Sequence, residues 1–172
     1  MTFSIPQTIC RLLAPQHSVS CSWFLWRRLL SALVNRGERY SRESGAFLLG
    51  FRRSGKVRIV DFVLYDDLDS RCLDTGIVRF DGRHFSALWA MCKERGLSVV
   101  ADVHTHMGSE AQSDSDRAHP MISRADHVAF ILPRFAARPL PVSDVGMYRY
   151  LGGKKWEIVP PESRRQFLHV GV

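Results

Sequence analysis

Apolar residues recur at helical spacing in two stretches of the chain, and each stretch predicts an amphipathic helix. The first covers residues 23–36, where Ser22 can cap the amino terminus and Gly37 can end the helix. Its apolar stripe, which we expect to pack on a core, contains Trp23, Trp26, Leu30, Leu33 and Val34. The second covers residues 81–95, with Asp81 as its cap and Gly96 at its end. One face of that helix carries Phe85, Leu88, Trp89 and Cys92.

Shorter apolar segments predict the strands of a sheet. Two pairs of segments flank the turn signals Ser54-Gly55 and Gly152-Gly153, and these pairs predict hairpins at residues 44–52 with 56–65 and 144–150 with 155–159. Single strands are expected at residues 77–80, 97–104 and 127–132, and a third helix at residues 113–123. Strands mixed with a few helices predict an α/β (α+β) fold, in which a mixed β-sheet is flanked by helices.

The size and composition of the chain suit one domain. The 172 residues are 45% hydrophobic, which is enough to bury a sizeable core. We expect the domain at residues 22–160, an irregular amino-terminal arm at 1–21 and a carboxy-terminal tail at 161–172. The four cysteines are scattered without a Cys-x-x-Cys pair, and no secretory signal is visible, so the interpretation is a cytoplasmic protein in a reducing compartment.

The charge of the chain narrows the classes of partner. Its net charge is +7, from 24 Lys+Arg against 17 Asp+Glu, but the basic residues are dispersed and form no stripe with aromatics. Specific nucleic-acid binding is therefore not expected. The aromatic run at residues 23–26 is soon interrupted by Arg27 and Arg28, so it is too short for a membrane span.

Two histidines and one aspartate form a candidate metal site. His104 and His106 end the apolar strand predicted at residues 97–104, and residues two apart in a strand face the same side. Ser113 is a natural helix cap, which places Asp116 in the first turn of a helix. Two imidazoles and one carboxylate are typical of a catalytic zinc site, because the fourth position is left for water.

Glu43 supplies a carboxylate that can accept a proton from such a water. Each feature alone also has an ordinary interpretation: an exposed strand histidine, a helix start, a solvated turn residue. Their combination favours metal chemistry. Asp102 could orient a ligand and His119 could lie beside the metal, whereas His84 and His127 are expected outside the site.

The pattern of a glutamate, then His-x-His, then Ser-x-x-Asp resembles the JAB/MPN metalloproteases, also called JAMM proteases, over residues 41–159. The resemblance implies an MPN/JAB-like fold of cytidine-deaminase-like architecture. It also implies Zn²⁺ bound by His104, His106 and Asp116, a water polarised by Glu43, and an oxyanion that accepts a hydrogen bond from Ser113.

The chain departs from the family pattern between the second histidine and the aspartate. Met107 and Gln112 stand where the family usually has proline. Nine residues, 107–115, separate His106 from Asp116, one fewer than in the family's most familiar form. These departures concern the loop and the position of Ser113 more than the metal ligands.

The resemblance implies hydrolysis of the isopeptide or peptide bond after the tail of a ubiquitin-like protein or its conjugates. Small stand-alone prokaryotic members often accompany ubiquitin-activating-like and conjugating-like enzymes, in some cases in antiphage defence operons. Three alternatives stay open: release of a sulfur-carrier-type protein from its adduct, a RadC-like DNA-associated protein, and a non-catalytic MPN scaffold.

Overall fold

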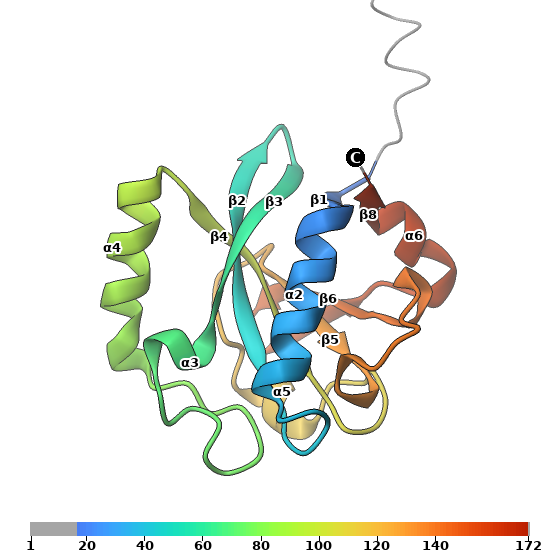
Figure 1. Cartoon of the computed structure of the whole chain (residues 1–172). Helices are drawn as coiled ribbons and strands as arrows, with labels where there is room; N and C mark the ends of the chain where they lie inside the picture. Colours follow the sequence, from blue (N-terminus) through green and yellow to red (C-terminus); the bar gives the residue numbers. More distant parts are fainter. Residues whose placement is uncertain (1–16, 172) are drawn as a thin grey trace, which may run out of the picture.

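The computed structural model describes residues 17–171, and an eight-stranded sheet runs through that region (Figure 1). The strands are β1 (Val19–Ser22), β2 (Gly45–Arg53), β3 (Lys56–Leu64), β4 (Ser98–Thr105), β5 (Val128–Leu132), β6 (Gly146–Gly152), β7 (Lys155–Ile158) and β8 (Leu168–Gly171). Their order in the sheet is β7-β6-β5-β4-β2-β3-β1-β8. β1 runs parallel to β3 and β8, β4 runs parallel to β5, and the other pairs are antiparallel. The expected mixed sheet is confirmed.

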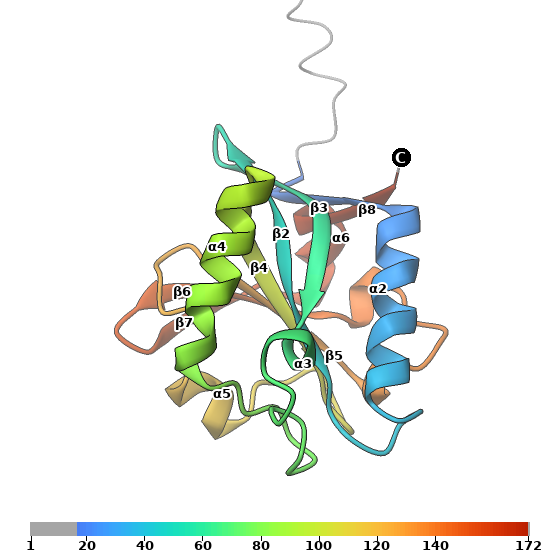
Figure 2. The same ribbon diagram turned by 60° about the vertical axis from the view of Figure 1, so that its left-hand side comes forward.

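Helices cover both faces of this sheet (Figure 2). The α-helices are α2 (Trp23–Arg36), α3 (Tyr65–Leu68), α4 (Phe85–Arg95), α5 (Asp114–Ala118) and α6 (Arg164–Phe167). Short 3₁₀ helices are η1 (Gly82–His84), η2 (Arg134–Ala136), η3 (Val142–Asp144) and η4 (Pro161–Ser163). Among the described residues, no helix combines the length and the apolar character needed to cross a membrane.

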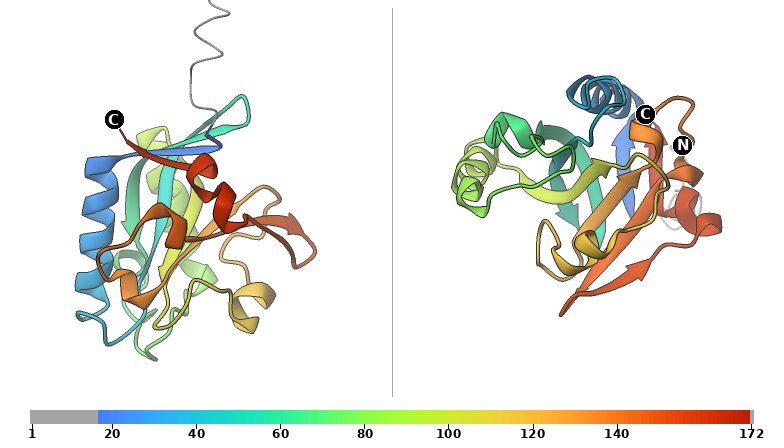
Figure 3. Two further views of the ribbon diagram at one scale, coloured as in Figure 1. Left: turned by 90° about the vertical axis from the view of Figure 1, so that its right-hand side faces the viewer. Right: turned by 90° about the horizontal axis from the view of Figure 1, so that it is seen from below.

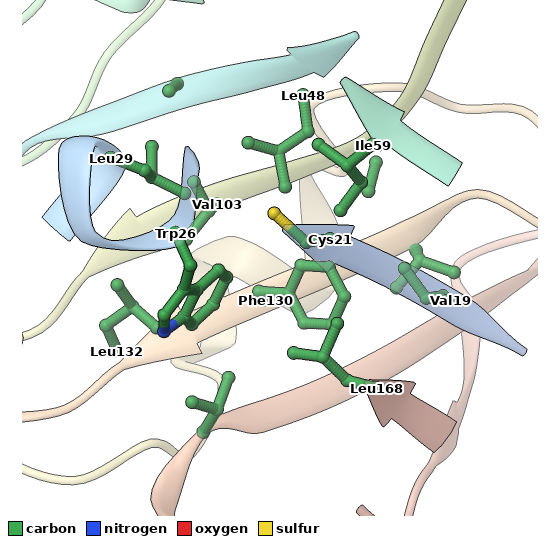
Figure 4. Close-up of a cluster of buried hydrophobic side chains, with 14 of the residues drawn as sticks. Val19, Cys21, Trp26, Leu29, Leu48, Ile59, Val103, Phe130, Leu132 and Leu168 are labelled. Carbon is green, nitrogen blue, oxygen red and sulfur yellow. The ribbon is translucent and has the colours of Figure 1, made fainter. Parts of the chain in front are cut away.

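The core lies in two layers, one on each side of the central strands. Alternate residues of β2 serve the two layers: Leu48 packs with the α2 layer, whereas Phe47 and Leu49 pack with the α4 layer. This explains why residues 45–50 are all buried, since a strand covered on both faces is apolar on both. Figure 4 shows the α2 layer, where Trp26 and Phe130 lie among aliphatic side chains.

The first predicted helix is confirmed with its cap: the Ser22 hydroxyl accepts a hydrogen bond from the Leu25 amide at 3.3 Å. The buried stripe, however, runs through Leu25, Trp26, Leu29, Leu30 and Leu33. Placing Trp23 in the stripe was wrong, because this first residue of the helix is 47% exposed. The same correction holds for Trp89 of α4, which stacks on Phe85 and is 46% exposed.

Two predicted elements differ from the structure. Residues 77–80 form no strand, because side chains and a turn engage their amides: Val78 donates to the Glu43 carboxylate and Arg79 donates to the Cys72 carbonyl. The helix predicted at 113–123 ends at Ala118. Pro120 explains the early end, since a proline disfavours helical geometry in the residue before it, here His119 with φ −128° and ψ 69°.

Other predicted elements are confirmed with small shifts of their ends. These are both hairpins, the second helix with Asp81 as the cap of η1 and Gly96 as the left-handed end of α4, and the strands β4 and β5. At the chain ends, residues 1–16 of the expected arm lie outside the described residues. Residues 161–171, expected as a tail, form η4, α6 and β8, and β8 pairs with β1.

Candidate metal centre

The end of β4 and the start of β2 lie at one end of the sheet, with α5 at that same end (Figure 3). His104 belongs to β4, His106 follows it, and Asp116 lies in α5. The Nε2 atoms of the two histidines are 2.9 Å apart. Each of them is 3.3 Å from a carboxylate oxygen of Asp116. The structure therefore brings together the three residues that the sequence singled out as metal ligands.

The spacing of these atoms fits a tetrahedral metal ion. Ligand atoms bound at about 2.0–2.1 Å around a tetrahedral zinc lie about 3.3–3.4 Å from one another. The observed separations of 2.9–3.3 Å are close to that value, and one donor atom from each of His104, His106 and Asp116 lies within 4.8 Å of the others. Two imidazole nitrogens and one carboxylate oxygen thus form a suitable donor set with a position left over.

The electrostatics of the three residues are coupled. Burial lowers the pKa of His104, but the hydrogen bond and the charge of Asp116 outweigh burial and raise it above its ordinary value. Burial raises the pKa of Asp116, but hydrogen bonds from both imidazoles and from Ser113 outweigh burial and hold it well below its usual range. The carboxylate is therefore ionised and ready to bind a cation throughout the physiological range.

Ser113 and Asp116 form a capping box at the start of α5. The Asp116 amide donates to the Ser113 hydroxyl at 3.1 Å, and the Asp116 carboxylate accepts from the Ser113 amide and hydroxyl at 2.7 Å each. The serine thereby holds the carboxylate that faces the histidines. The oxyanion role expected for Ser113 stays a prediction, since the hydroxyl here contacts Asp116.

Glu43 lies directly before β2, which pairs with β4 so that Gly45 is opposite His104. Its amide donates to the Gly76 carbonyl at 2.9 Å, and its carboxylate accepts from the Val78 amide at 3.3 Å. Glu43 and His104 line the same cavity, and the charge of Glu43 contributes to the raised pKa of His104. The Glu43 carboxylate thus lies beside the three candidate ligands but is not one of them.

Ser44 and Thr105 lock Glu43 in register with the histidines. Both are fully buried. The Ser44 amide donates to the Thr105 hydroxyl at 2.9 Å, and the Thr105 amide donates to the Ser44 carbonyl at 2.9 Å. The Ser44 hydroxyl also donates to the Leu33 carbonyl at 2.8 Å, which ties this pair to α2. Sequence reasoning missed both residues; a polar residue between two ligands on a buried strand was the available signal.

An open cavity of about 540 Å³ adjoins the cluster. Glu43, His104 and Asp116 line it near the metal site. Ser113 does not line the cavity. Other lining residues are Val78, Arg79, Phe80, Phe85, Asp102, Gln112, Ser115, His119, Pro120, Met121, Ala129 and Trp156. His119 therefore lies at the cavity, as expected for a residue near the metal, but bonds to none of the three ligands. The cavity gives a substrate access to the cluster.

Asp102 forms hydrogen bonds within the core and none with a candidate metal ligand. Its carboxylate lies 2.5 Å from the His127 ring nitrogen Nε2 and accepts from the Tyr65 hydroxyl at 3.2 Å. All three side chains are almost fully buried. Burial, followed by the charge and hydrogen bond of Asp102, raises the pKa of Tyr65 well above its ordinary value. A buried aspartate requires hydrogen-bond partners, so its place in the apolar strand 98–105 was the sequence signal for this group of three side chains.

Comparisons with known proteins find similarity in sequence and in fold. No protein-family model matches the chain. The chain is similar to the probable metalloprotease y4jG of Sinorhizobium fredii, with 25% identity over 118 residues, which cover 69% of this chain and 73% of the relative. Its fold is similar to the solution structure of protein DSY2949 from Desulfitobacterium hafniense, with a TM-score of 0.60, 14% identity and coverage of 83% of this chain and 90% of the other. The relative suggests a metallopeptidase, and the cluster of His104, His106 and Asp116 suggests a bound metal ion.

Proposed function

We propose that this chain is a zinc-dependent isopeptidase or peptidase of the JAB/MPN (JAMM) type, acting after the carboxy-terminal tail of a ubiquitin-like protein. The observation that carries the proposal is the juxtaposition of a His-His-Asp cluster with a separate carboxylate, Glu43, at one cavity. A structural zinc site is closed by four protein ligands, whereas this cluster has three, and hydrolysis needs a base such as Glu43 beside the metal.

The residues divide the reaction between them. When bound by His104, His106 and Asp116, a zinc ion supplies a Lewis acid and lowers the pKa of a bound water from about 15.7 to about 7. Glu43 accepts the proton of the attacking water and then delivers it to the leaving amine, so that its carboxylate is regenerated. No covalent acyl-enzyme is needed. Ser113 would have to turn its hydroxyl away from the Asp116 carboxylate to donate to the oxyanion, where a donor is worth about 3 kcal/mol of barrier lowering.

An extended substrate fits the wall of the cavity next to Glu43. Residues 77–80 pair with no strand of the described sheet, yet Val78, Arg79 and Phe80 line the cavity. The amides of Val78 and Arg79 are already engaged within the chain, so an extended tail along this segment would donate its own amides to the carbonyls of the segment. Because β4 lies inside the sheet between β2 and β5, this segment supports the proposal better than a sheet edge does. Small residues such as glycine suit a tail that must approach the metal closely.

The partners proposed for the chain follow from that substrate. They are a ubiquitin-like protein with a Gly-Gly tail and its conjugates, together with the activating-like and conjugating-like enzymes that would make those conjugates. Each of these is a proposal that rests on the resemblance of the motif to the JAB/MPN proteases.

Cleavage of defined fusions tests the function. Ubiquitin and several ubiquitin-like proteins are fused through Gly-Gly tails to a reporter and incubated with wild-type protein, with the Glu43→Gln variant and with a zinc chelator. We expect cleavage by wild-type protein alone, and at least about a tenfold loss when a leucine replaces the final glycine, about 1.4 kcal/mol in transition-state binding. Cleavage that survives the chelator, or equal cleavage of an unfolded polypeptide such as casein, would contradict the proposal.

A further inference from the structure

The metal loop, defined here as residues 107–113, joins His106 to the helix that carries Asp116. Its sequence, Met-Gly-Ser-Glu-Ala-Gln-Ser, contains no proline and includes a glycine, so its backbone has no intrinsic stiffness. The loop must nevertheless deliver Asp116 to within 3.3 Å of two imidazoles. Contacts from elsewhere in the domain have to supply the order that the loop sequence lacks.

Tyr148 of β6 supplies the first of these contacts. Its hydroxyl donates to the Glu110 carbonyl at 2.8 Å and accepts from the Gln112 amide at 3.2 Å. One buried hydroxyl thus satisfies two backbone groups on either side of Ala111. The residue is 4% exposed, so neither water nor an alternative partner replaces these bonds easily.

Arg164 of α6 supplies the second contact. Both of its terminal nitrogens donate to the Glu110 carboxylate at 3.2 Å, and Nη1 also donates to the Ser143 carbonyl at 2.8 Å. The guanidinium is almost fully buried, which is rare for an unconstrained arginine. The pair therefore links the metal loop to the carboxy-terminal helix, 54 residues further along the chain.

The backbone of β6 touches the loop as well. A Cβ atom on Gly146 would lie 2.2 Å from the Glu110 carbonyl oxygen, so only glycine permits the observed approach. Beyond the loop, Arg117 of α5 donates to the Gln112 carbonyl at 3.0 Å. Contacts from β6 and α6 thus fix Glu110 and Gln112, and Arg117 connects α5 to Gln112.

We propose that Tyr148 and Arg164 are positioning residues, which hold the metal loop so that Asp116 completes the metal centre. They act through Glu110 and Gln112 and touch neither substrate nor ligand. The inference rests on the proposed zinc site. Outer partners of this kind typically change metal affinity by about 10–100-fold when they are removed.

Two variants and two matched controls test the proposal in the full chain. Tyr148→Phe removes only the bridging hydroxyl, and Tyr150→Phe is its control, because the Tyr150 hydroxyl bonds the Lys154 amide in the distant β6–β7 turn. Arg164→Met removes the buried guanidinium, and Arg165→Met changes its exposed neighbour. Zinc affinity is measured by competition with a chelating indicator, and the visible spectrum of cobalt-loaded protein reports the ligand geometry.

We expect both variants to weaken zinc binding about tenfold or more and to alter the cobalt spectrum, while both controls behave as wild type. Amide hydrogen exchange of residues 107–116 in metal-free protein should accelerate in the two variants alone. If wild-type protein binds zinc and both variants keep its affinity and spectrum while only their melting temperature falls, the positioning role is overturned and the proposed function stands. If wild-type protein binds no zinc, both proposals are overturned.

Discussion

The Ser44 amide donates to the Thr105 hydroxyl at 2.9 Å, in a fully buried pair that joins two strands of the sheet. Ser44 follows Glu43, and Thr105 lies between the two histidines. This hydrogen bond and the one from the Thr105 amide to the Ser44 carbonyl hold the proposed general base beside the proposed metal ligands. The base is positioned by backbone pairing and is therefore independent of the metal.

The Thr105→Val variant tests this arrangement, because valine keeps the shape of threonine and removes the hydroxyl. The Ser44 amide loses its partner in the core, at a cost of about 1–3 kcal/mol in the free energy of unfolding. We expect turnover to fall while the zinc content is kept, since the metal ligands are unchanged. Loss of zinc together with turnover would show that Thr105 supports the ligands instead of Glu43.

Ser113→Ala separates two roles of the serine. The capping box predicts a loss of about 1 kcal/mol in stability and weaker zinc binding, because the hydroxyl contacts the Asp116 carboxylate. An oxyanion donor alone predicts a fall in kcat with unchanged zinc affinity. Denaturant unfolding, zinc competition and steady-state kinetics distinguish the two, with Ser86→Ala at an exposed position of α4 as the control. Unchanged stability and zinc affinity would reject the capping role.

The buried group of Tyr65, Asp102 and His127 makes a prediction about stability. His127→Leu leaves the Asp102 carboxylate without its closest partner in the core. We expect a loss of about 3–5 kcal/mol in the free energy of unfolding, as for other broken buried pairs. Tyr65→Phe removes one hydrogen bond and should cost about 1–3 kcal/mol. Urea unfolding of both variants measures this, and a loss under 1 kcal/mol for His127→Leu would contradict the assignment of the pair.

The raised pKa of His104 makes zinc binding depend on pH. Zinc requires a neutral imidazole, so its affinity should fall as the pH drops through this raised value. In metal-free protein the sign is opposite: the interaction of protonated His104 with Asp116 stabilises the fold below the ordinary histidine pKa of about 6.5 and is lost as the pH rises. The difference in melting temperature between zinc-loaded and metal-free protein should therefore grow from pH 6 to pH 8. A constant difference over that interval would contradict the predicted coupling.

Local signals in the sequence predicted most of the fold, because caps and turns are specified by neighbouring residues. Ser22, Ser54-Gly55 and Gly96 behave as expected. The parallel pairing of β1 with β8 joins residues 149 positions apart, Val19 with Leu168, and no local pattern encodes it. The strand expected at 77–80 failed for a related reason, since Glu43 provides a competing acceptor from far along the chain.

The candidate ligands were predictable because their chemistry and spacing are explicit in the sequence. His104 and His106 lie two apart at a strand end, and Ser113 marks the helix start that presents Asp116. The residues that hold this group in place, such as Tyr148, were not predictable. Their polar atoms bond backbone groups that only the tertiary structure brings near.

The metal content of purified protein tests the central claim most directly. We expect about one zinc ion per chain in wild-type protein and in His119→Ala, whose histidine lines the cavity without joining the cluster. His104→Ala and Asp116→Ala should retain less than about a tenth of that zinc after dialysis, while circular dichroism shows them folded. Unchanged zinc in the folded His104→Ala and Asp116→Ala variants, or no zinc in wild-type protein, would contradict the account.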